Sequence, residues 1–217
     1  MVSSMHAERN RKILETLRSL YPDAKPALIY SNPFELLIAT MLSAQSTDNQ
    51  VNKVTAKLFA KYKTPAELAQ LKPEELEEHI KGCGLYKNKS KNIIATCKIL
   101  VEKYNGQVPE SLEQLTELPG VGRKTANVVL SNAFGQDAIA VDTHVFRVAN
   151  RLGLAYAKDP LNTELQLQQS IPQKYWSQAH HWLIYHGRKI CKARNPDCGV
   201  CPLEKHCPTG TSKPASF

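Results

Sequence analysis

Apolar residues recur along this chain at spacings of three and four, which is the period that places one face of a helix against a core. Such stripes run from Ile13 to Leu20, from Phe34 to Leu42 and from Ile93 to Tyr104. Proline, glycine or short polar residues bound them, and these residue types begin or end helices. The pattern therefore predicts an all-α fold.

Two kinds of helix start can be recognised in the sequence. Thr64 precedes Pro65 and has Glu67 three residues later, so it is typical of an N-cap followed by a proline at the first helical position. Ser111 with Gln114 has the spacing of a capping box, as does Thr47 with Gln50. We expect a helix from Lys89 to Tyr104, a loop from Leu154 to Asn162 with a helix beginning at Thr163, and a long helix from Lys174.

A glycine-rich turn, Gly120-Val121-Gly122, lies between two expected helices near the middle of the chain. Glycine permits positive φ and close approach of the backbone, and the first N–H groups of the following helix point into a positive field. The turn is therefore either an ordinary helix corner or a cradle for an anion. Arg123 and Lys124 at its mouth favour phosphate as the anion.

Lys124 is a candidate nucleophile. On a helical wheel it lies opposite the apolar face of its helix, so it faces solvent or a cleft, as most lysines do. A nucleophilic amine must be neutral, and at the reference pKa of ~10.4 only about one lysine in 2,500 is neutral at pH 7. The N-terminus of a helix favours the neutral amine, and Lys124 lies at such a position.

Asp142 precedes a stripe that runs from Val145 to Leu152. Its simplest role is the N-cap of that helix, and a catalytic carboxylate is the alternative. The two roles are compatible.

Four cysteines lie close together near the end of the chain, in a sequence with two others: Cys191, Cys198, Cys201 and Cys207. Thiols concentrated in this way indicate a metal site. Their spacing alone suits a zinc ion and a [4Fe–4S] cluster equally well. For the histidines of the preceding helix, His180, His181 and His186, helix packing is the better interpretation than metal binding.

The composition indicates which kind of partner the protein binds and where it is located. The net charge is +8, with 28 Lys and Arg against 20 Asp and Glu, which favours a polyanion. No run of 18 apolar residues and no apolar signal segment occur, so we expect a soluble, intracellular protein without a membrane anchor. In a reducing cytosol the six cysteines do not form disulfides.

The string LPGVGRKTANVVL is followed, 18 residues after its lysine, by the aspartate of VDTHVFRV. This arrangement resembles the helix-hairpin-helix and active-site segment of DNA repair glycosylases. With the C-x6-C-x2-C-x5-C spacing of the cysteines, the chain is similar from Ile13 to Cys207 to the endonuclease III family of bifunctional glycosylases and abasic-site lyases.

The resemblance implies two helical domains with a DNA-binding cleft between them. One domain, residues 23–134, would carry the hairpin; the other, residues 1–22 and 135–217, would carry Asp142 and a [4Fe–4S] cluster on the four cysteines. It implies removal of oxidised pyrimidines from duplex DNA through a Schiff base on Lys124, then strand cleavage 3′ to the abasic site by β-elimination. Asp142 would stabilise positive charge on the sugar. The enzyme would be a monomer in the cytoplasm, associated with the nucleoid.

The resemblance also implies DNA contacts. Gln45 would enter the duplex, Asp48 would line the base pocket, and Leu85 would be a wedge opposite the lesion. By position alone, Leu85 could equally close its loop onto the core. Further contacts are implied for Gly120, Val121, Gly122, Arg123, Thr143, His144 and Lys192.

Other functions remain open at this stage. A monofunctional adenine glycosylase resembles this pattern but lacks the lysine and has a further C-terminal domain, whereas this chain has Lys124 and ends ten residues after Cys207. A noncatalytic DNA-binding module would need neither Lys124 nor Asp142, and an electron carrier would not need the hairpin. A weak repeat of the hairpin at Gly82-Cys83-Gly84 suggests a second phosphate site.

Overall fold

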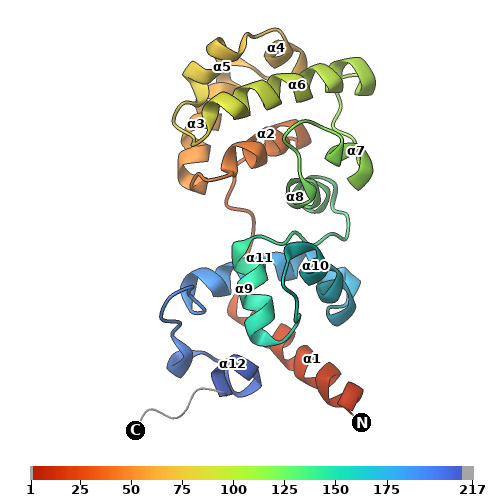
Figure 1. Cartoon of the computed structure of the whole chain (residues 1–217), viewed down its shortest axis with the longest axis vertical. Coiled ribbons are helices and arrows are strands. Elements are labelled where there is room, and N and C mark those ends of the chain that lie inside the picture. Colours follow the sequence, from red (N-terminus) through yellow and green to blue (C-terminus); the bar gives the residue numbers. More distant parts are fainter. Residues whose placement is uncertain (1, 212–217) are drawn as a thin grey trace. The chain divides into compact units, whose positions relative to one another are not determined.

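The computed structural model describes residues 2–211, with side chains from Met5 onward (Figure 1). Every regular element in that range is a helix, so the predicted all-α class is confirmed. None of the described helices is long and apolar enough to cross a membrane. The α-helices are α1 (Val2–Leu20), α2 (Pro33–Ser43), α3 (Asp48–Lys61), α4 (Pro65–Ala69), α5 (Pro73–Ile80), α6 (Tyr86–Tyr104), α7 (Leu112–Thr116), α8 (Arg123–Phe134), α9 (Thr143–Leu152), α10 (Pro160–Ser170), α11 (Trp176–Lys189) and α12 (Pro208–Thr211). Short 3-10 turns are η1 (Gln173–Tyr175), η2 (Cys198–Val200) and η3 (Glu204–His206).

The chain forms two compact units. Unit 1 consists of Met1–Lys25 and Asp137–Phe217, and unit 2 of Pro26–Gln136. The sequence analysis predicted a domain of residues 23–134, and the corresponding unit here is unit 2. Each unit is described by itself below.

Unit 2 is built around α2. Its side chains from Leu36 to Leu42 are buried without a break, as expected of a helix that neighbours surround. Helices α3, α6 and α8 pack against it. Helices α4 and α5 cover α6, and α7 packs on α8, so the glycine turn between α7 and α8 is held close to the core of the unit.

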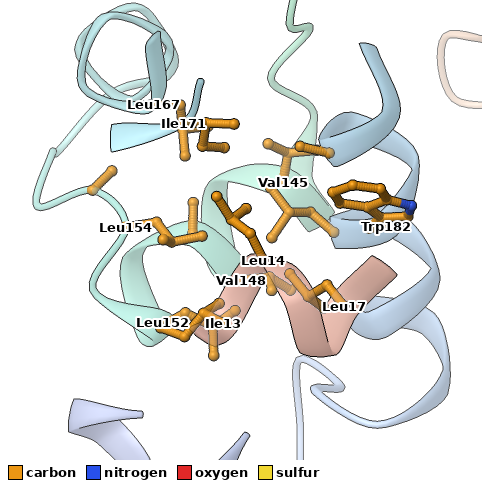
Figure 2. Packing of buried hydrophobic residues seen from close by; sticks show 14 of the residues in the cluster. Ile13, Leu14, Leu17, Val145, Val148, Leu152, Leu154, Leu167, Ile171 and Trp182 are labelled. Carbon is orange, nitrogen blue, oxygen red and sulfur yellow. The ribbon is translucent and has the colours of Figure 1, made fainter. Parts of the chain in front are cut away.

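Unit 1 has a core to which both ends of the sequence contribute (Figure 2). Ile13 and Leu17 from α1 meet Val148 from α9 and Trp182 from α11, together with residues of α10. All four of these side chains are at most 4% exposed. The N-terminal helix is therefore a structural part of a unit whose other residues begin at Asp137.

The predicted caps form. Thr64 and Glu67 make a reciprocal capping box at α4, and the Thr47 and Ser111 side chains accept the N–H groups of Gln50 and Gln114. These contacts fix the first turns of α3, α4 and α7.

Three predicted helix starts were wrong. Helix α10 begins at Pro160, because Asp159 caps it by accepting the Asn162 N–H at 2.8 Å and the proline takes the first position. Helix α6 begins at Tyr86, before Lys89, since Leu85 is its N-cap in a left-handed conformation. The helix expected from Lys174 begins at Trp176, after the 3-10 turn η1.

Candidate active site

The glycine turn between α7 and α8 requires glycine at its first position. Gly120 has a φ of +76°, and a Cβ there would lie 2.9 Å from the Asn92 Cβ and Nδ2. Both the left-handed conformation and the lack of space exclude a side chain. The carbonyl of Pro119 accepts a hydrogen bond from Thr96 Oγ1 at 2.9 Å, so helix α6 anchors the turn.

The other end of the turn is open. Gly122 is the N-cap of α8, and a Cβ at this position would meet nothing within 4 Å. A glycine has no side chain with which to cap the first amides, so the start of α8 can receive an anion from outside. Arg123 and Lys124 are exposed there, whereas the Val121 side chain is buried. Any contact of Val121 with DNA must therefore be made by its backbone.

The second glycine turn has a different backbone. Its left-handed residue is Leu85, which is itself the N-cap of α6, whereas Gly120 lies two residues before the N-cap of α8. The Cys83 N–H is bonded to the Ile80 carbonyl at 2.8 Å, and the Gly84 N–H to Ser46 Oγ at 3.0 Å. The first turn has the counterpart of the first bond, from the Val121 N–H to the Leu118 carbonyl at 3.0 Å, so this bond does not distinguish the two turns. The bond from Gly84 to Ser46 occupies the amide that corresponds to that of Gly122. A second phosphate site at Gly82-Cys83-Gly84 stays a prediction.

Gln45 and Leu85 both occupy the left-handed region, with φ of 55° and 59°. Both are exposed, and Leu85 keeps 54% of its surface accessible. A left-handed conformation is uncommon for a residue with a side chain and is found where the surroundings enforce it. Asp48, which follows this loop, is the first residue of α3 and is partly buried.

Lys89 is a residue of this region that the sequence analysis did not single out. It is buried, and its Nζ donates to the carbonyls of Leu42 and Ala44 at 2.7 and 2.6 Å. Burial lowers its pKa. The signal was present in the sequence, because Lys89 lies four and eight residues before Ile93 and Cys97 on the apolar stripe of α6.

Asp142 belongs to unit 1, whereas Lys124 belongs to unit 2. Asp142 is the N-cap of α9, and its Oδ1 accepts the Val145 N–H at 2.7 Å, which confirms the capping role. The carboxylate is partly buried, and the neighbouring Thr143 is exposed. His144 is partly buried, with its Nδ1 3.2 Å from Arg147 Nη2.

The histidines of α11 are buried within unit 1. His180 Nδ1 lies 2.7 Å from the Ala140 carbonyl, just before Asp142. His186 is fully buried, and its Nδ1 is 3.0 Å from the Tyr21 hydroxyl. Burial lowers the pKa of His181 to about 3 and that of His186 to about 4, so both rings are neutral at pH 7. These rings pack in the core, as expected.

Three of the four C-terminal cysteines, Cys191, Cys201 and Cys207, pack against the unit 1 core. Burial raises the pKa of Cys201, and the negative charge of the neighbouring thiolates of Cys207, Cys191 and Cys198 raises this pKa further. The Gly210 N–H donates to Cys207 Sγ at 3.4 Å, and Arg151 Nη1 donates to Cys191 Sγ at 3.6 Å. Grouped thiols with N–H donors to sulfur suit an iron–sulfur cluster. Among the described side chains, no three His, Cys, Asp or Glu are placed to hold a single metal ion.

Arg147 and Arg151 connect this cysteine loop to α9. Arg147 Nε donates to the Cys191 carbonyl at 3.2 Å, and Arg151 donates to the carbonyls of Lys192 and Ala193 at 2.7 and 3.1 Å. The loop is therefore fixed to α9, the helix that Asp142 caps. Neither arginine was identified from the sequence, because their partners lie about 40 residues away.

Comparison with known proteins identifies the family. The profile described as "HhH-GPD superfamily base excision DNA repair protein" matches residues 38–173, more than half of the chain. The endonuclease III of Rickettsia conorii is 53% identical over 94% of this chain and 97% of its own, and that of Escherichia coli K12 is 50% identical over 94% and 96%. This chain belongs to the endonuclease III family.

Members of the endonuclease III family are DNA glycosylases and abasic-site lyases of base excision repair, and this chain is such an enzyme. A second profile, "Iron-sulfur binding domain of endonuclease III", matches residues 191–207, the segment that spans the four cysteines. The cofactor is a [4Fe–4S] cluster. A solved relative, 50% identical with a TM-score of 0.90, covers 94% of this chain and 97% of its own. This relative is a trapped endonuclease III–DNA covalent intermediate, an estranged-adenine complex.

Proposed function

We propose that this enzyme removes oxidised pyrimidines from duplex DNA through a Schiff base on Lys124 and then cuts the strand 3′ to the abasic site by β-elimination. The observation that carries the proposal is the position of Lys124. It lies exposed in the first turn of α8, two residues after a glycine cap that leaves room for a phosphate. The trapped covalent complex of the solved relative supports a nucleophile on the protein.

A base stacked in a duplex is out of reach of any side chain, so the damaged nucleotide must leave the stack at a cost of about a few kcal/mol. Gln45 and Leu85 would fill the space that it leaves, and their exposure at two left-handed loop positions supports this role. Asp48, three residues after Gln45 at the start of α3, would line the pocket for the extruded base.

The chemistry then proceeds at the sugar. The neutral amine of Lys124 attacks C1′, the C1′–N bond breaks, and the base leaves with a proton. The C1′–O4′ bond then breaks and O4′ takes a proton from solvent. The nitrogen, which has given one of its two protons to the leaving base, keeps the other, and this gives a protonated imine. Removal of a proton from C2′ allows the C3′–O bond to break, and the 3′ phosphate leaves. Atoms and charges balance without an oxidant or a reductant.

Asp142 would stabilise the positive charge that develops on the sugar as the base departs. Its cap contact with the Val145 N–H orients the carboxylate before substrate arrives. A carboxylate next to Lys124 would also favour the ammonium form, which is not nucleophilic. In the proposal Asp142 therefore acts on the sugar and does not pair with the resting amine.

The remaining DNA contacts would be phosphate contacts. The backbone of Gly120, Val121 and Gly122 would bind one phosphate, with Arg123 beside it, and Thr143 and His144 at the start of α9 would bind another. Lys192 would join them after releasing Asp197, to which its Nζ donates at 2.8 Å. The cysteines Cys191, Cys198, Cys201 and Cys207 would hold the cluster, whose iron–sulfur bonds close the loop that carries Lys192.

Borohydride trapping tests the nucleophile. The enzyme is incubated with duplex DNA that contains thymine glycol, or in parallel an abasic site, and borohydride reduces any imine to a stable covalent complex. We expect wild type and Lys98→Gln, which alters an exposed lysine of α6, to be trapped, and Lys124→Gln not to be. A trapped complex with Lys124→Gln would assign the nucleophile to another amine, and none with wild type would reject the imine mechanism.

A further inference from the structure

Two loops of unit 2 that lie far apart in sequence are joined at one buried ammonium group. The loop after α2 contains Ala44, Gln45 and Ser46, and the loop before α6 contains Gly84 and Leu85. The Gly84 N–H donates to Ser46 Oγ at 3.0 Å. A Cβ on Gly84 would lie 3.1 Å from the Gln45 carbonyl oxygen, so the two loops are in close contact and a side chain there would be crowded.

Lys89 provides the ammonium group at this junction. Its Nζ donates to the carbonyls of Leu42 and Ala44, and it lies 3.5 Å from Ser46 Oγ. The Leu42 carbonyl is in the last turn of α2 and Ala44 is the C-cap, so the ammonium satisfies carbonyls that the helix leaves without partners. A positive charge is also favourable at a helix C-terminus.

Each left-handed residue is held next to these contacts. Gln45 has Ala44 and Ser46 on either side, and both are bonded to or approached by Lys89. Leu85 follows Gly84, and its carbonyl accepts the backbone N–H of Lys89 at 3.1 Å, a helix bond that does not depend on the side chain. The left-handed conformation costs about 1–2 kcal/mol per residue and persists only where the surroundings determine it. The Lys89 ammonium supplies a large part of those surroundings for Gln45, and it acts on Leu85 through Ser46 Oγ, which accepts the Gly84 N–H.

We propose that Lys89 is a positioning residue that holds Gln45 and Leu85 as a preassembled pair for insertion into the duplex. The inference rests on the proposed role of these two side chains. Because their backbones are ordered before DNA binds, insertion costs less conformational entropy. The advantage is largest where a base pair must be opened, and it is smaller where the target nucleotide is already unpaired.

The test compares single-turnover cleavage of one lesion in two settings, a fully paired duplex and a duplex in which the lesion has no opposite nucleotide. Lys89→Met keeps most of the buried stem and removes the donors. We expect it to slow cleavage of the paired substrate about tenfold, the size of one lost charge-assisted hydrogen bond, and to slow the unpaired substrate less than about threefold. Ser46→Ala, a milder change at the same junction, should shift the ratio in the same direction even if Lys89→Met folds poorly.

The matched control is Leu100→Ala, which removes a fully buried side chain of α6 away from the loops. Measured below its melting temperature, it should leave the ratio of the two rates unchanged. Equal slowing of both substrates by Lys89→Met, or no slowing, overturns the proposal. Leu85→Ala distinguishes a failure of the positioning role of Lys89 from a failure of the proposed insertion of Leu85 itself. If it shifts the ratio and Lys89→Met does not, only the positioning role fails; if neither does while wild type is still trapped by borohydride, insertion itself fails.

Discussion

The two roles of Asp142 can be separated by two substitutions. Asp142→Ala removes the oxygen that accepts the Val145 N–H, so the first turn of α9 loses its cap. The expected cost is about 1 kcal/mol in the free energy of unfolding. Helix α9 lies in the unit 1 core, with Val145, Val148 and Leu152 at most 1% exposed, so the loss should appear in unfolding of the unit. Asp142→Asn keeps an acceptor oxygen and loses only the charge near the helix N-terminus, about 0.5 kcal/mol.

Catalysis should respond differently. Because both variants lack the carboxylate charge, both should cleave an oxidised-pyrimidine duplex about a hundredfold more slowly, or worse, in single-turnover experiments with excess enzyme. Unfolding is followed in urea by circular dichroism on the same preparations. The asparagine variant is thus expected to be nearly as stable as wild type and nearly as inactive as the alanine variant.

Asp159 provides the control, since it caps α10 in the same unit by accepting the Asn162 N–H at 2.8 Å. Asp159→Ala should cost a similar stability, about 1 kcal/mol, without changing the cleavage rate. Near-wild-type cleavage by Asp142→Asn would refute the need for a carboxylate. A rate loss in Asp159→Ala as large as in Asp142→Ala would show that the effect comes from stability alone.

Three further predictions concern the turn, the cysteine loop and the buried histidines. Gly120→Ala should lower the free energy of unfolding by about 2 kcal/mol, because the position has a φ of +76° and the new side chain would overlap Asn92. Gly122→Ala, whose side chain would lie in open space, should keep the stability and weaken binding to duplex DNA. Equal melting temperatures for the two variants would contradict this. Arg151→Ala removes two hydrogen bonds to backbone carbonyls of the cysteine loop, so we expect the free energy of unfolding to fall by about 2 kcal/mol and the protein to hold less iron per chain. Unchanged iron content would refute the anchoring role of Arg151. Burial lowers the pKa of His181 to about 3 in the folded protein, from about 6.5 in the unfolded chain, so below pH 6.5 the unfolded chain takes up a proton that the folded protein does not. The free energy of unfolding should therefore fall by up to about 3 kcal/mol between pH 6.5 and 4.5. The fall should be less steep in His181→Gln, and an equal slope in the two proteins would refute this.

Local sequence predicted the helices well where their ends are set by nearby residues. The caps at Thr47, Thr64 and Ser111 form because donor and acceptor lie three residues apart. The start of α10 was missed although its signal is local, since Asp159 before Pro160 is a good cap. At α6 the left-handed conformation of Leu85 decides the start, and its surroundings include Ser46, 38 residues from Gly84.

By itself, the sequence determined the all-α class, the glycine turn with Lys124 at its mouth, the cap at Asp142 and the grouping of four cysteines. These features depend on residue type and short spacing, which a chain carries before it folds. Only the tertiary structure showed which carbonyls Lys89 meets at the end of α2, that Arg151 holds the cysteine loop, and that α1 completes the unit 1 core. Each of these depends on partners 40 or more residues away, and no local pattern specifies which distant carbonyl an ammonium or guanidinium group will meet.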